Sequence, residues 1–118
     1  MALRSSGLER RDFISLTDAC MAIDHLLHLP RHILGNGLFN VGSGWTPTLW
    51  ETACLIQKRC EAILTFQPQL TRVPPQMDEK IIDLDYRIDA LRKTGFTPRA
   101  DKTLELDRLL EFCQDSFS

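Results

Sequence analysis

Residues 10–18 read Arg10-Arg11-Asp12-Phe13-Ile14-Ser15-Leu16-Thr17-Asp18. Two arginines and an aspartate precede a short apolar run, and a helix-start signal follows at once. We expect residues 9–16 to form a strand, paired as a hairpin with residues 2–4 through the turn Ser5-Ser6-Gly7. Thr17 or Asp18 can cap a helix, because apolar residues then recur at helical spacing until Pro30. A strand that leads into a helix predicts an α/β fold.

The rest of the chain continues this alternation. Short strands are expected at residues 38–41, 69–73 and 81–82, with turns at Gly35-Asn36-Gly37 and Gly42-Ser43-Gly44. Thr48 and Glu51 have the spacing of a capping box, which predicts a helix through residue 63. A short helix is expected from Asp85 through Ile88 and Leu91, with Gly95 as the residue past its end. The last helix carries an apolar stripe, formed by Leu106, Leu109, Leu110, Cys113 and Phe117. The fold class expected is α/β, with a few short strands and about four helices.

Composition restricts the class of protein. At 118 residues the chain is expected to be one domain, residues 1–118. The net charge is −2, which offers no basic field for nucleic acid. No apolar run approaches the ~20 residues of a membrane span, and the first residues lack the apolar middle of a signal peptide. We therefore expect a cytoplasmic protein that binds neither nucleic acid nor membrane.

Neither the cysteines nor the histidines indicate a metal site. The cysteines form no C-x-x-C pair, and each lies in a helical apolar pattern, so free buried thiols are expected: Cys20, Cys54, Cys60 and Cys113. Three histidines have the spacing i, i+3, i+7, but Pro30 interrupts it: His25, His28 and His32. Histidines near a helix C-terminus interact favourably with the helix dipole, and this explains the spacing better than metal binding does.

Two features point toward phosphate with different strength. Gly42 and Gly44 follow an expected strand, but Pro47 stands where a dinucleotide-binding loop needs its third glycine, so a turn explains them better. Arginine presents a planar fork suited to phosphate, and on a strand Arg10 and Arg11 point to opposite faces. Only one of the two can face a given pocket. The alternative is that these arginines, like Arg4, are ordinary solvated surface charges.

Three segments in this order resemble the C-terminal third of the extended short-chain dehydrogenase/reductases, the NAD-dependent nucleotide-sugar epimerases and dehydratases. They are RRDFISLTDA, FNVGSGWTPTLWE and DLDYRIDALRKTGFTPR, at residues 10–19, 39–51 and 83–99. The resemblance extends over nearly the whole chain. It implies that Arg11 reaches the pyrophosphate of a nucleotide sugar and that Arg10 does not. Many members place a second arginine in an R-x-G-D segment, where this chain has Gln76-Met77-Asp78-Glu79.

The resemblance also implies what this chain lacks. Family members need a glycine-rich N-terminal Rossmann domain and a Tyr-x-x-x-Lys pair, whereas the residue four positions after Tyr86 is Ala90. The expected function is that of a substrate-binding lobe without catalytic, cofactor-binding or metal-binding residues of its own. Whether the chain is itself an enzyme stays open. NAD(P) is expected only in a full-length parent.

Two kinds of partner follow from the resemblance. One is the missing N-terminal cofactor domain, and the other is a second copy of the chain. Self-association would bury an orphaned apolar face to which Leu16, Phe39 and Trp45 could contribute. The alternative function is a non-catalytic α/β interaction module descended from the same family.

Overall fold

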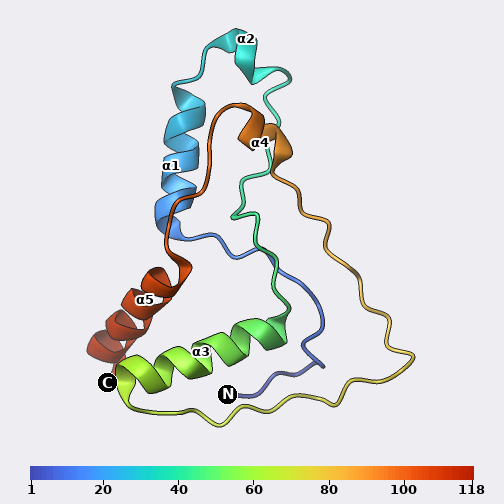
Figure 1. Cartoon of the computed structure of the whole chain (residues 1–118), viewed down its shortest axis with the longest axis vertical. Coiled ribbons are helices and arrows are strands. Elements are labelled where there is room, and N and C mark those ends of the chain that lie inside the picture. The colour runs from blue at the N-terminus through green and yellow to red at the C-terminus, as the bar shows by residue number, and fades with distance from the viewer. The chain divides into compact units, whose positions relative to one another are not determined.

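The computed structural model describes all 118 residues and contains five helices (Figure 1). These are α1 (Leu16–Leu27), α2 (Arg31–Leu34), α3 (Leu49–Leu64), α4 (Asp89–Lys93) and α5 (Lys102–Phe117). The chain divides into two compact units. Unit 1 comprises Met1–Arg11, Pro47–Leu84 and Asp101–Ser118, and unit 2 comprises Asp12–Thr46 and Asp85–Ala100.

The expectation of an α/β fold is wrong, because the chain contains no strand. The hairpin does not form, and the extended segments make only two isolated bridges, Ala2 with Thr71 and Arg10 with Thr48. Local sequence prevents the second bridge from extending into a pair of strands. Pro47 accepts from the Arg11 N–H at 3.1 Å but has no N–H to return, and the chain turns into α3 at Leu49.

The first bridge is limited in a similar way. The Leu3 N–H donates to the Thr71 carbonyl at 2.9 Å, and the Thr71 N–H donates to the Met1 carbonyl at 3.1 Å. Two prolines, Pro74 and Pro75, follow shortly afterwards and supply no further donors. The chain is therefore helical, with extended segments that lack the neighbours needed for a sheet.

In unit 1, α3 packs against α5 (Figure 1). The predicted capping box is confirmed: the Glu51 N–H donates to Thr48 Oγ1 at 3.1 Å, and the Thr48 N–H donates to Glu51 Oε2 at 2.8 Å. Arg59 and Asp107 join the two helices through a bidentate pair of 2.7 and 2.8 Å. The apolar stripe expected on α5 is only partly covered, since Phe117 remains 80% exposed.

Unit 2 is built around a small apolar core. Its buried members are Ala22 of α1, Ile88 at the N-cap of α4, Leu91 within α4, and Phe96. Half-buried side chains pack against this core: Leu26, Phe39, Val41 and Tyr86. Helix α4 begins at Asp89 and is shorter than expected from Asp85.

Helix α1 starts earlier than the sequence indicated. Ser15, rather than Thr17 or Asp18, is its N-cap, and Ser15 Oγ accepts from the Asp18 N–H at 3.0 Å. Pro30 is the N-cap of the additional helix α2, where a residue without an N–H is tolerated. Of the cysteines expected to be buried, Cys60 is buried and Cys54 half-buried, whereas Cys20 and Cys113 are exposed.

Candidate functional site

Asp12 organises the glycine turn of unit 2. Its Oδ1 accepts the Ser43 N–H at 2.8 Å, and its Oδ2 accepts the Gly44 N–H at 3.1 Å. These are the amides that a phosphate-binding loop would offer to its ligand. Because a carboxylate of the same unit already occupies them, this turn does not present a phosphate cradle.

The turn also needs glycine for steric reasons. A Cβ on Gly42 would lie 2.6 Å from Tyr86 Cε1 and 2.9 Å from Asp12 Oδ2. Gly44 has a φ of +71°, and a Cβ there would lie 2.5 Å from Arg92 Nη2. Gly42 and Gly44 thus serve close packing, in agreement with the turn interpretation of the sequence.

The motifs on which the resemblance rests are joined by further hydrogen bonds within unit 2. Asp18 is 4% exposed, and its Oδ1 accepts the N–H groups of Arg99 at 2.9 Å and Ala100 at 3.1 Å. Tyr86 Oη donates to the Val41 carbonyl at 2.9 Å. The aspartates and the tyrosine are therefore structural links, a role that the sequence interpretation did not assign to them.

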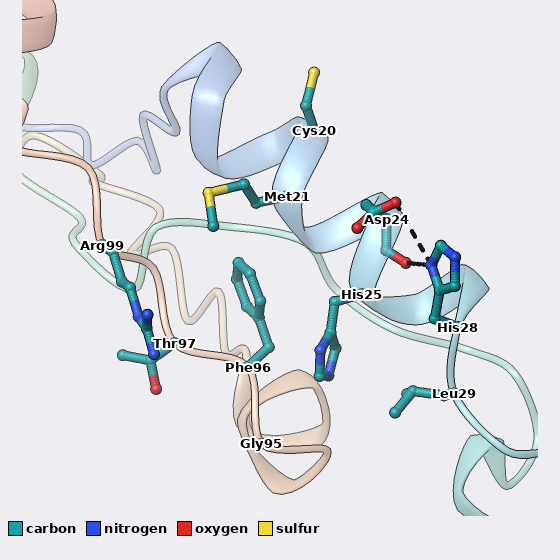
Figure 2. A pocket seen from close by; sticks show the side chains of 10 residues that line it. All are labelled: Cys20, Met21, Asp24, His25, His28, Leu29, Gly95, Phe96, Thr97 and Arg99. Atoms are coloured by element: carbon teal, nitrogen blue, oxygen red, sulfur yellow. Dashed lines mark hydrogen bonds and ion pairs between the residues drawn. The ribbon is translucent and has the colours of Figure 1, made fainter.

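Unit 2 also holds an open cavity of about 760 Å³ between α1 and the segment after α4 (Figure 2). Phe96 lines it, with its ring centroid 5.6 Å from that of His25. The histidines have neighbours within the unit. His25 Nε2 lies 2.9 Å from Thr94 Oγ1. His28 Nδ1 lies 2.8 Å from the Asp24 carbonyl oxygen (Figure 2). No group of three or more His, Cys, Asp or Glu side chains is placed to hold a metal ion.

Arg11, the candidate binding residue, lines a separate cavity of about 400 Å³ in unit 1. This cavity is named the Arg11 pocket. Its other lining residues are Glu9, Glu79, Lys80, Ile81, Ile82 and Leu84. The Arg11 side chain is exposed, and its hydrogen bond from Nη1 goes to the Arg10 carbonyl oxygen at 3.1 Å. Most donors of this guanidinium are therefore directed at no acceptor of the chain.

Two carboxylates of the Arg11 pocket are held by serines. Ser5 Oγ donates to Glu9 Oε1 at 2.7 Å, and Ser6 Oγ donates to Glu79 Oε1. The Ser5 hydrogen bond is the main cause that lowers the pKa of Glu9, with a smaller contribution from the charge of Arg11. Glu9 therefore stays ionised at neutral pH and adds a negative charge beside the guanidinium.

Arg10 and Arg4 do not line this pocket. Arg10 forms the isolated bridge with Thr48, and its Nε lies 3.8 Å from Asp83 Oδ1. Arg4 is exposed. Gln76, at the place of the second family arginine, is also exposed and outside the pocket lining.

No protein-family model and no curated protein sequence matches the chain. Solved structures do match its fold. A dTDP-glucose 4,6-dehydratase (rfbB) from Bacillus anthracis, solved in complex with NAD, has a TM-score of 0.64 and 19% identity over 98% of this chain. MlghC, a GDP-mannoheptose C4 reductase from Campylobacter jejuni with NADP bound, has a TM-score of 0.68 and 20% identity over 96% of the chain. The PbgP3 protein from Burkholderia pseudomallei has a TM-score of 0.68 and 14% identity over 98%.

These comparisons define the fold. The chain spans 34% of the length of each of the three proteins, and the part matched is their C-terminal region. Its fold is therefore that of the C-terminal portion of nucleotide-sugar dehydratases and reductases. None of the five helices is long and apolar enough to cross a membrane.

Proposed function

We propose that the chain is the substrate-binding portion of an NAD(P)-dependent nucleotide-sugar epimerase/dehydratase-like protein and is not catalytic by itself. Its ligand is a nucleotide-sugar diphosphate, which binds in the Arg11 pocket. The observation that carries the proposal is the position of Arg11. In a chain with the fold of such enzymes, the arginine of the resembling motif lines a cavity whose volume suits a small-molecule ligand.

The chemistry of this contact follows from the guanidinium. Arginine presents five N–H donors in a planar fork, which pairs with two oxygens of a phosphate. Arg11 uses a donor of Nη1 on a backbone carbonyl, so its remaining donors can meet the ligand. Such a charge-assisted contact contributes more than a neutral hydrogen bond does.

The redox step is assigned to a different domain. The hydroxyl of Tyr86, the single tyrosine, donates a hydrogen bond to the Val41 carbonyl, and its side chain packs against the core of unit 2. The residue four positions later is Ala90, which has no amine to lower the pKa of a phenol. We therefore propose that a cofactor-binding domain supplies NAD(P) and the catalytic pair, and that this chain supplies binding.

The experiment is a titration of the chain with dTDP-glucose, followed by calorimetry or by chemical shifts of backbone amides. The proposal predicts saturable binding with the largest shifts around the Arg11 pocket. A parallel titration with NAD serves as the control, because the chain is expected not to bind the cofactor at millimolar levels. Saturable micromolar binding of NAD, or no binding of the nucleotide sugar, would contradict the assigned division of roles.

A second candidate function, a non-catalytic interaction module, is favoured by exposed apolar side chains in unit 2. Leu16, Leu27 and Leu38 are 79, 77 and 75% exposed, respectively. Phe39 and Trp45, which were expected to form an orphaned face together with Leu16, are half-buried. Sedimentation at increasing concentration, combined with binding of an apolar dye, tests this candidate. A strictly monomeric chain without dye binding would leave it without support.

A further inference from the structure

A second cation lines the Arg11 pocket. Lys80, from the irregular stretch between α3 and α4, borders the same 400 Å³ cavity as Arg11. Lys80 is exposed, and its ammonium group takes part in no hydrogen bond or ion pair within the chain. Two cationic side chains from distant parts of the sequence thus border one cavity.

Several other cations of unit 1 are held by contacts within the chain. Arg10 lies near Asp83, Arg59 pairs with Asp107, and Arg72 stacks over the Trp50 ring with its Cζ 4.1 Å from the centroid. The free ammonium of Lys80 is distinct from these structural contacts. It is the kind of group that an anionic ligand can recruit without breaking an existing bond.

The remaining walls of the pocket limit what the ligand can be. Glu9 and Glu79 accept hydrogen bonds from Ser5 and Ser6, and no hydrogen bond or ion pair joins either carboxylate to Arg11 or Lys80, so both cations keep donors for an anionic ligand. Ile82, which is 87% exposed, offers an apolar surface on the same rim. A ligand with adjacent phosphates and an uncharged remainder matches this combination of groups.

We infer that Lys80 is a second phosphate-binding residue of the Arg11 pocket, so that the pocket recognises a diphosphate rather than a monophosphate. This inference rests on the proposed function. In the arrangement inferred, the Arg11 fork holds one phosphate, and the Lys80 ammonium contacts the adjacent one as a point charge. With two cations, the pocket can offset the charge of a diphosphate although Glu9 and Glu79 also line it.

The experiment titrates wild type, Lys80→Ala, Lys80→Arg and the control Lys58→Ala with dTDP and with dTMP. Lys58 is an exposed lysine of α3 in the same unit, outside the pocket, so its removal changes net charge equally. Lys80→Ala should weaken dTDP binding about tenfold, by the loss of one charged hydrogen bond at an exposed site. It should weaken dTMP binding only about twofold, and Lys58→Ala should change either affinity less than that. Lys80→Arg should retain most of the dTDP affinity.

The outcomes separate this inference from the proposed function. If wild type binds neither dTDP nor dTDP-glucose, both are overturned. If wild type binds dTDP and Arg11→Ala weakens it, while Lys80→Ala binds as tightly as wild type, only the role of Lys80 is overturned. An equal loss for dTDP and dTMP in Lys80→Ala would also contradict discrimination between them. Circular dichroism of each variant checks that the fold is unchanged.

Discussion

Replacing Asp18 by alanine should destabilise the chain more than any change at its exposed carboxylates. The Asp18 carboxylate is almost fully buried and accepts two backbone N–H groups, those of Arg99 and Ala100, at distances of 2.9 to 3.1 Å. A hydrogen bond to a charged group contributes about 1.5–3 kcal/mol, and the loss of both leaves two amides unpaired. Because the two bonds share one carboxylate, we expect a combined loss of about 3 kcal/mol rather than a full sum.

This loss is large against the total stability of a small protein, about 5–15 kcal/mol. At an unfolding entropy of about 0.25 kcal/mol/K for a chain of this length, it lowers the melting temperature by roughly 12 °C. Urea and thermal unfolding, followed by circular dichroism, measure both quantities. Asp24→Ala is the matched control, because that carboxylate lies on the same helix with its side chain 76% exposed. An Asp18→Ala variant within about 0.5 kcal/mol of Asp24→Ala would refute the structural role of Asp18.

Three further changes test other parts of the structure. Gly42→Ala should destabilise by about 1–3 kcal/mol in urea unfolding, because its methyl group would overlap the Tyr86 ring; unchanged stability would contradict the close packing. Thr48→Ala should lower the free energy of unfolding by about 1 kcal/mol in the same assay, because the N-cap is lost. Unchanged stability would contradict a stabilising role of the capping box. Hydrogen bonds from Thr48 lower the pKa of Glu51 below its ordinary value of 4.5, so this contribution is present above that value and lost as the pH falls through the folded pKa. Unfolding between pH 6 and about 3 should therefore show less loss of stability in Glu51→Gln than in wild type.

The parts of the fold that the sequence predicted correctly depend on local interactions. The capping box needs only Thr48 and Glu51, which are three residues apart, so their spacing was enough to locate the start of α3. The strands failed because pairing depends on distant segments. Thr71 and Thr48, the observed bridge partners of Ala2 and Arg10, have no sequence signal that identifies them.

The same distinction applies to functional residues. Resemblance identified Arg11, but the structure adds that Lys80 borders its pocket, and no local spacing connects these two residues. Asp18 was expected at most to cap its own helix. Its carboxylate instead accepts amides 81 and 82 residues further along the chain, and Ser15 takes the capping role. Ser15, Thr17 and Asp18 are all favourable N-cap residues, so propensity alone does not select one of them. The long-range contact of Asp18 leaves the capping role to Ser15.

The most direct test of the central claim, that Arg11 binds the diphosphate of a nucleotide sugar, is the affinity of Arg11 variants for dTDP-glucose. Arg11→Ala should weaken binding roughly ten- to a hundredfold, since a charged hydrogen bond contributes about 1.5–3 kcal/mol. Arg11→Lys should recover only part of the loss, because a point charge does not reproduce the fork. Arg10→Ala, the control, should bind nearly as wild type does, because Arg10 lies outside the pocket lining. Equal affinities for wild type and Arg11→Ala would contradict the claim and leave Arg11 as a solvated surface charge.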